Sequence, residues 1–199
     1  MSLNFIEYIC INHYIDMKTI NDVKIVAEQL MAQKFTFKTY HKEFNMSAND
    51  LGYRFEFDTA KRRFGCCWYR DKKITLSMPI CQENLDKIET IITNTILHEL
   101  AHAFSVQAYG ITEGKGHGNK WKHIARQIGC DAERCYKSES INKPESKYTL
   151  ICDNCKKESP KHKKLELSIK RGYACGKCCN EHNNGKFTDK YKLRLIVNY

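Results

Sequence analysis

Residues 88–109 read IETIITNTILHELAHAFSVQAY, and they contain an H-E-x-x-H box, His98-Glu99-Leu100-Ala101-His102. On a helix, two side chains four residues apart project from the same face, one turn from each other. Both imidazoles can therefore reach one zinc ion, with Glu99 placed where its carboxylate can take a proton from a bound water. The alternative is a pair of core histidines that are each hydrogen-bonded to the backbone. That alternative explains neither the spacing nor the glutamate.

The residues around the box predict a buried helix. Asp86 followed by Glu89 resembles a capping box that starts the helix, and Gly110 fits the position just after its end. Residues 88–104 are apolar on more than one side, as expected for a helix that is covered all round. Because burying unpaired polar groups is costly, the two histidines and the glutamate need partners, which favours a metal site.

A third ligand is needed, because a catalytic zinc usually has three protein ligands and one water. Ser105 and Ala108 stand where the metzincin pattern requires glycine and histidine, so that class is excluded. The next histidine is His117, in the glycine-rich stretch GKGHGNKW of residues 114–121, which allows a tight return of the backbone. Asn119 can cap a second helix there that ends at Gly129. His117 is the preferred ligand; Glu113 and His123 are the competitors.

The rest of residues 1–145 predicts a mixture of helices and strands. A helical pattern begins at Asn21, and residues 34–50 suggest a second helical or loop segment. Alternating stretches at 53–57, 64–69 and 73–78 predict a three-stranded antiparallel meander closed by Pro79, with residues 74–77 as an edge strand. Cys66 and Cys67 are adjacent on a strand and face opposite sides, so they do not share a metal. We therefore expect an α+β fold.

A second metal site is predicted by four cysteines near the C-terminus. Cys152 and Cys155 form one C-x2-C pair, and Cys175 and Cys178 form another after nineteen intervening residues. This spacing is typical of a structural zinc site in a small ribbon. Cys179 and His182 leave the fourth ligand open, although the x2 spacing favours Cys178. Strands are expected at 148–151, 164–169 and 191–197, and the polar residues 138–147 mark a domain edge between 1–145 and 146–199.

The net charge of +10 is concentrated in this C-terminal part. Residues 1–145 carry 20 basic and 18 acidic side chains, whereas residues 146–199 carry 13 and 5. Such an asymmetry points to a polyanionic partner, and exposed aromatic residues can stack on bases. We expect sequence-independent binding of nucleic acid. The alternative is a basic surface that only keeps the protein in solution. The candidate contacts are Lys156, Lys157, Lys163, Lys164, Lys170, Arg171 and Tyr173.

Taken together, the motifs HELAHAF and GHGNKW, with fifteen residues from His102 to His117, resemble the SprT/Spartan metalloproteases. Residues 64–69 and 73–77 resemble the strands before that family's active-site helix, and the cysteine pairs resemble its zinc-binding part. The resemblance extends from Val23 to the C-terminus. It implies a zincin-like core, three ligands (His98, His102 and His117), Glu99 as the catalytic base, and a small C-terminal zinc ribbon.

The resemblance further implies a zinc-dependent endopeptidase, with one catalytic and one structural zinc, that cleaves proteins bound or crosslinked to DNA. The expected partner is single-stranded DNA, bound without sequence preference. Two alternatives stay open: a nucleic-acid-binding adaptor with a non-proteolytic zinc site, and a zinc-dependent nuclease. Tyr109, Arg126 or a loop backbone N–H could stabilise the oxyanion. Without a basic signal-peptide start or a long apolar run, we expect an intracellular protein, cytoplasmic or nuclear, with no membrane partner.

Overall fold

The structure is a computed structural model that describes residues 18–133, 141–161 and 172–198. It divides into two compact units, Met1–Pro144 and Glu145–Tyr199, here called unit 1 and unit 2. Helices and strands occur in both units, so the chain is α+β, as predicted. No helix within the described ranges is both long and apolar enough to cross a membrane.

Unit 1 begins with helix α2 (Ile20–Ala32), which confirms the helix predicted from Asn21. Thr19 and Asp22 form a capping box at its start, which satisfies backbone N–H groups that the helix leaves unpaired. Its apolar face is fully buried in the core of unit 1. That face consists of Val23, Val26, Ala27, Leu30 and Met31.

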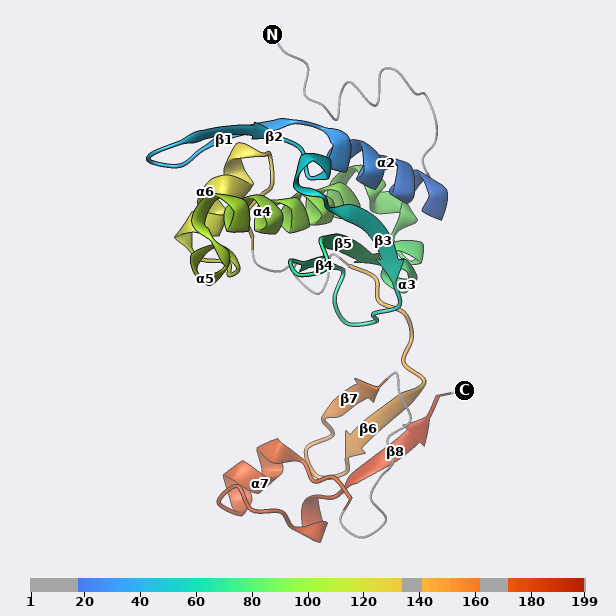
Figure 1. Ribbon diagram of the computed structural model, residues 1–199. Helices are drawn as coiled ribbons and strands as arrows, with labels where there is room; N and C mark the ends of the chain where they lie inside the picture. The colour runs from blue at the N-terminus through green and yellow to red at the C-terminus, as the bar shows by residue number, and fades with distance from the viewer. Residues whose placement is uncertain (1–17, 134–140, 162–171, 199) are drawn as a thin grey trace. The chain divides into compact units, whose positions relative to one another are not determined.

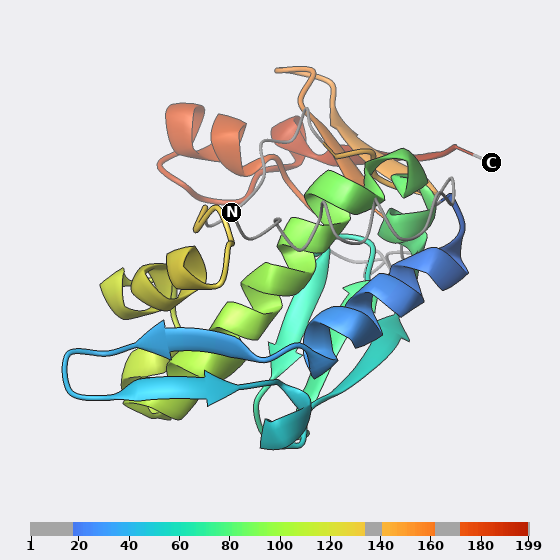
Figure 2. The ribbon, with the colours of Figure 1, turned by 90° about the horizontal axis from the view of Figure 1, so that it is seen from above.

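A hairpin follows where the sequence suggested a helical or loop segment, so that prediction is wrong. Strands β1 (Phe35–Lys38) and β2 (Glu43–Met46) pair antiparallel. Phe35, Phe37 and Phe44 alternate with exposed polar residues and are buried. The Phe37 ring stacks on Phe104 of helix α4 (Thr93–Tyr109), with 5.0 Å between centroids, so the hairpin lies beside α4 (Figure 2).

The three strands predicted next exist, but they do not form a meander. They are β3 (Arg54–Asp58), β4 (Gly65–Trp68) and β5 (Lys73–Ser77), joined in the order β3-β5-β4. β5 pairs parallel to β3 and antiparallel to β4. Residues 74–77 therefore belong to the central strand rather than to an edge. Residues 74–77 of β5 are buried on both faces of the strand. The buried hydroxyls have partners: Thr75 donates a hydrogen bond to Asp58, and Ser77 donates one to the carbonyl of Ala60.

Helical segments complete unit 1. Short helix α3 (Met78–Gln82) contains Pro79 in its first turn, and a 3-10 turn (Leu85–Lys87) and a π-helical turn (Ile88–Ile92) follow it. Helix α4 (Thr93–Tyr109) then crosses the unit above the β3-β5-β4 sheet, with α2 beside it (Figure 1). The chain ends unit 1 with α5 (Ile111–Gly114) and α6 (Asn119–Gln127).

The predicted capping box at Asp86 is wrong, because no side chain caps the helical turns Leu85–Lys87 and Ile88–Ile92, which lead directly into α4 at Thr93. The hydroxyl of Thr93 donates to the carbonyl of Ile88, five residues back, at 2.7 Å, which suits the wider turn that precedes the helix. The predicted end is confirmed, since Gly110 follows the last residue of α4 with φ of 79°.

Unit 2 contains a second sheet and a short helix. Strands β6 (Tyr148–Cys152), β7 (Glu158–Lys161) and β8 (Leu193–Val197) pair antiparallel in the order β7-β6-β8. β6 extends one residue beyond the strand predicted at 148–151, and β8 lies within the one predicted at 191–197. The strand predicted at 164–169 lies outside the described residues. Helix α7 (Gly176–His182) and a 3-10 turn (Asp189–Tyr191) were not anticipated.

Candidate metal centre

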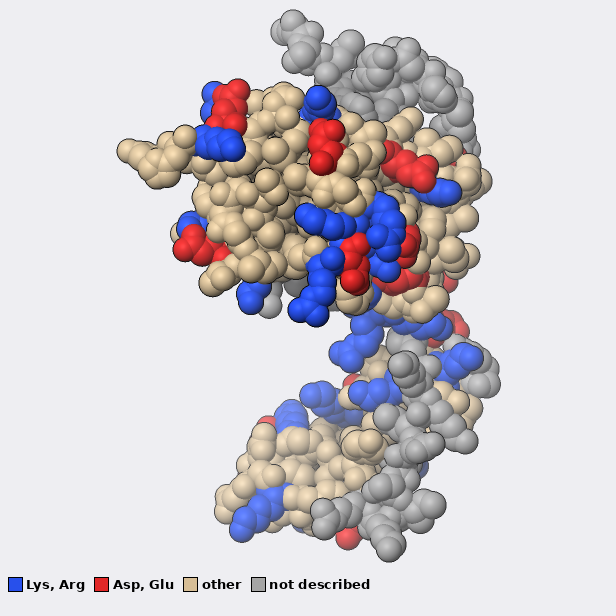
Figure 3. All heavy atoms as spheres, in the orientation of Figure 1, with Lys and Arg blue, Asp and Glu red and all other residues tan. Residues whose placement is uncertain are grey.

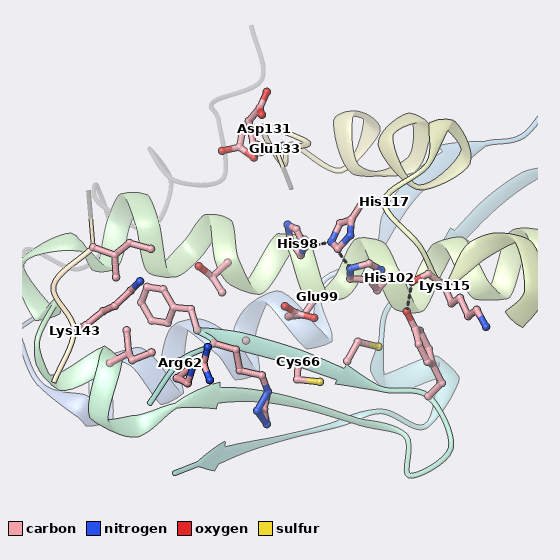
Figure 4. A pocket seen from close by; sticks show the side chains of 18 residues that line it. Arg62, Cys66, His98, Glu99, His102, Lys115, His117, Asp131, Glu133 and Lys143 are labelled. Carbon is pink, nitrogen blue, oxygen red and sulfur yellow. Dashed lines mark hydrogen bonds between the residues drawn. The ribbon is translucent and has the colours of Figure 1, made fainter. Parts of the chain in front are cut away.

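The three predicted histidines lie together. His98 and His102 project from α4 one turn apart, and His117 reaches them from the loop between α5 and α6 (Figure 4). The Nε2 atom of His117 lies 2.9 Å from Nε2 of His98 and 3.1 Å from Nε2 of His102. One ligand nitrogen from each ring is within 4.8 Å of the others.

This arrangement fits a metal ion. Two nitrogens bound tetrahedrally at about 2.0–2.1 Å from zinc lie about 3.3 Å apart, close to the separations found here. Hydrogen bonding alone cannot account for the cluster, because one N–H of His117 can donate to only one neighbour. Burial, with the nearby imidazoles, lowers the pKa of His98 to about 4 and that of His102 to about 3. Both rings are then neutral, as ligation requires.

The loop that carries His117 is fixed by a close backbone contact. A Cβ atom on Gly114 would lie 2.4 Å from the carbonyl oxygen of Ser105, so only glycine allows α5 to pack this tightly on α4. His123 bonds instead to the backbone carbonyl of Lys38, at 2.9 Å. Glu113 forms an ion pair with Lys120. The structure therefore brings His117, and neither competitor, to the other two histidines.

Glu99 lies beside the histidines against strand β4. Its side chain is only 7% exposed, and this burial raises the pKa of the carboxyl to about 8. The backbone N–H of Cys67 and the charge of Arg63 act in the opposite direction. A Cβ atom on Gly65 would lie 2.8 Å from both Cγ and Oε1 of Glu99, so glycine at this place in β4 makes room for the carboxylate.

The histidines and Glu99 line a pocket of about 510 Å³ (Figure 4). Four basic residues line it, namely Arg62, Arg63, Lys115 and Lys143. Two acidic residues, Asp131 and Glu133, line it as well. Tyr69 also lines the pocket, and its hydroxyl donates to the carbonyl of Lys115 at 3.1 Å. Tyr109 and Arg126, which the sequence suggested as oxyanion donors, are not among the described residues that line it.

A buried asparagine holds one wall of this pocket. Ile141 and Lys143 line the pocket, and Asn142 between them is clamped by the fully buried Asn84. The side-chain amide of Asn84 donates to the carbonyl of Asn142 at 2.8 Å, and the backbone N–H of Asn142 donates back to its Oδ1 at 2.9 Å. The wall is thus fixed by hydrogen bonds between two residues that are 58 positions apart in the chain.

The comparisons with known proteins agree with this geometry. The family model described as "SprT-like family" matches residues 33–141, which is more than half of the chain. The chain belongs to the SprT-like family. The matched range contains the three histidines, Glu99 and β4, and it ends before the cysteine pairs, so it is shorter than the resemblance seen in the sequence. No curated protein and no solved structure matched the chain.

The four cysteines of this SprT-like protein also converge. Sγ of Cys152 lies 3.7 Å from that of Cys178, and Sγ of Cys155 lies 3.6 Å from that of Cys175. Four thiolates at about 2.3 Å from one zinc ion would stand about 3.8 Å apart, so the group fits a tetrahedral site. Backbone N–H groups, chiefly that of Cys155, lower the pKa of the Cys152 thiol to about 7 and favour the thiolate.

The ambiguity about the fourth ligand is resolved by position. Cys178 is fully buried in the cysteine group, whereas Cys179 packs into the small core of unit 2 outside that group. The ring of His182 lies against Tyr191, at 5.7 Å between centroids. The pairs Cys152/Cys155 and Cys175/Cys178 are therefore the ones that the structure gathers.

The candidate nucleic-acid contacts are only partly described. Lys156 and Lys157 are exposed in the turn after Cys155, and Tyr173 is 44% exposed. Phe187, a further aromatic residue, is 48% exposed. Lysine and arginine side chains are spread over the face of unit 2 seen in Figure 3. Lys163, Lys164, Lys170 and Arg171 lie outside the described residues.

Proposed function

We propose that this protein is a zinc-dependent endopeptidase that cleaves proteins bound or crosslinked to DNA. The observation that carries the proposal is the convergence of three imidazoles beside a buried glutamate, in a pocket large enough for peptide side chains. Membership of the SprT-like family supports it. We further propose that unit 1 has a zincin-like core and that unit 2 is a zinc ribbon.

In this proposal His98, His102 and His117 hold the catalytic zinc, which when bound polarises the peptide carbonyl and acidifies a water. The positive charge of a bound ion would favour the ionised form of Glu99, whose pKa is raised by burial alone. Glu99 accepts a proton from the attacking water as the new C–O bond forms. Glu99 then donates that proton to the amide nitrogen as the C–N bond breaks. Tyr69 lies on the pocket wall, where its hydroxyl can donate to the developing oxyanion after leaving the Lys115 carbonyl.

The substrate backbone is proposed to pair with β4 instead of β5. β4 is at one edge of the β3-β5-β4 sheet, and its residues Gly65, Cys66 and Cys67 line the pocket next to Glu99. An edge strand offers backbone N–H and C=O groups to an extended peptide. A structure with a bound peptide would test this, since pairing at residues 65–68 is expected.

Gly65→Ala is expected to reduce cleavage about 10- to 100-fold while the protein stays folded and metal-bound. The added methyl group would contact Glu99 at 2.8 Å and displace a flexible side chain, and small displacements of a catalytic group are costly. The measurement is kcat for a peptide substrate together with zinc content. Gly116→Ala is the matched control, because its added Cβ meets nothing within 4 Å. Unchanged cleavage by Gly65→Ala would contradict the placement of Glu99.

Unit 2 is proposed to bind single-stranded DNA without sequence preference through its lysines and exposed aromatic residues. The affinity is expected to fall about 100-fold or more between about 50 and about 200 mM salt, because several phosphate contacts release counterions. Fluorescence anisotropy with two oligonucleotides of unrelated sequence measures this. Lys156→Glu with Lys157→Glu should lower the salt slope, and Lys24→Glu on α2 serves as the control. A loss of only several-fold would count against a multi-phosphate contact.

The experiment that tests the whole proposal offers the purified, zinc-loaded protein two substrates at once: single-stranded DNA and a protein bound to that DNA. Cleavage of the protein with intact DNA supports the proposal. Nicked DNA with intact protein would favour a zinc-dependent nuclease. Binding of DNA without any cleavage would favour an adaptor with a non-proteolytic zinc site.

A further inference from the structure

A fully buried tryptophan lies against all three candidate ligands. The Trp121 ring is 4.6 Å from the ring of His98, 5.2 Å from that of His102 and 4.7 Å from that of His117, measured between centroids. Trp121 is 0% exposed. Its indole N–H has no hydrogen-bond partner among the described residues, so the packing of the ring outweighs the cost of an unpaired polar group.

The position of Trp121 in the chain connects the two parts of the cluster. It lies in the first turn of α6, four residues after His117, and α6 packs on α4, which carries His98 and His102. Gly116 and Gly118 flank His117 with open space around them, so the two flanking residues do not orient its ring. One rigid indole thus contacts ligands from two segments that are separate in sequence.

This contact has a consequence for the imidazole rings. A histidine ring turns about its χ2 torsion, which has only broad preferences of its own, so neighbours must decide where Nε2 points. The indole meets the ring of His117 nearly edge-on, at 76°, and that of His102 at a shallow 31°. A smaller side chain at position 121 would leave a cavity into which the rings could turn.

We propose that Trp121 is a positioning residue for the metal site, which holds the three imidazoles in the orientation for ligation, and that its indole is an optical reporter of the bound ion. This inference rests on the proposed function, since it takes the three histidines to be metal ligands. A residue that only filled the core would contribute to stability without changing the metal affinity of the folded protein.

Zinc affinity separates these roles. Trp121→Phe is expected to weaken zinc binding at the histidine site about 10-fold, and Trp121→Leu about 100-fold, as is usual when the support of a metal ligand is removed. Affinity is measured in the full chain by competition with a chelating dye. Leu30→Ala on α2, which is equally buried and belongs to another helix, controls for lost stability. If Trp121→Leu binds zinc with an affinity within about two-fold of that of the wild type, the inference is overturned.

Fluorescence provides a readout that does not depend on that variant. The chain has two tryptophans, so Trp68→Phe leaves Trp121 as the only one. Co²⁺ is expected to quench most of the remaining emission, and the further change His102→Ala is expected to abolish this quenching. If zinc and Co²⁺ bind the histidines but leave the emission unchanged, the reporter role is overturned. If neither ion binds the wild type there, the proposed function fails as well.

Discussion

Glutamine in place of Glu99 is expected to reduce protein cleavage about 100- to 10,000-fold while zinc stays bound. Glu99 is the acidic residue of the H-E-x-x-H box, between the two histidines of α4 in the sequence. Its side chain lines the pocket. Glutamine has nearly the same shape and can still accept the N–H of Cys67, but it cannot accept a proton from water. The loss is thus expected in kcat rather than in substrate binding.

The measurement compares kcat, KM and zinc content of the wild type and Glu99→Gln on a DNA-bound protein and on a free peptide. Asp131→Asn is a matched control, because Asp131 also lines the pocket but lies apart from Glu99 (Figure 4). It is expected to change kcat far less. Full cleavage by Glu99→Gln with zinc bound would remove Glu99 from the mechanism, and with it the proposed protease.

The candidate site could be predicted well because its key parts are local in sequence. The four-residue spacing of His98 and His102 and the helical period place both rings on one face. Each cysteine pair is likewise fixed by a short turn, with two residues between ligands. The glycine-rich stretch predicts the tight return that brings His117 to α4, and the close contact of Gly114 with Ser105 is what fixes it.

The strand order could not be predicted because it depends on contacts far apart in sequence. Neighbouring strands joined by short turns usually pair, which favoured a meander. β5 instead lies between β3 and β4. Its polar residues suggested an exposed face, yet Thr75 is buried, and Asp58, 17 residues earlier, accepts a hydrogen bond from its hydroxyl. A local pattern does not contain that information.

Several residues that shape the site were missed, and some left a signal. An isolated glycine in a strand pattern indicates a close approach of another group, so Gly65 could have been singled out. Trp121 ends the glycine-rich stretch 114–121, and an apolar residue in the first turn of a helix gives no hint of a contact with the histidines. Asn84 left no local signal, since its role depends on Asn142 and on the path of the chain between them.

Cys178→Ala is expected to unfold unit 2 and remove one zinc per chain. The core of this unit is small: among the described residues, one buried cluster consists of Cys152, Cys175, Cys178, Cys179 and Tyr191, and Leu150 is buried as well. A core of that size contributes only about 3–5 kcal/mol at most, whereas a structural zinc contributes about 10–16 kcal/mol of apparent binding free energy. Without its fourth thiolate the ion is held much more weakly, and folding loses its largest favourable contribution.

Cys179→Ala provides a matched control, because Cys179 is the next residue, is also buried, and lies outside the ligand group. It is expected to cost about 1 kcal/mol and to leave the zinc content unchanged. Metal analysis and the protease sensitivity of Glu145–Tyr199 measure both effects. Tryptophan emission, which comes only from unit 1, shows whether that unit stays folded. If Cys179→Ala loses the zinc and Cys178→Ala keeps it, the gathered set of four thiolates is wrong.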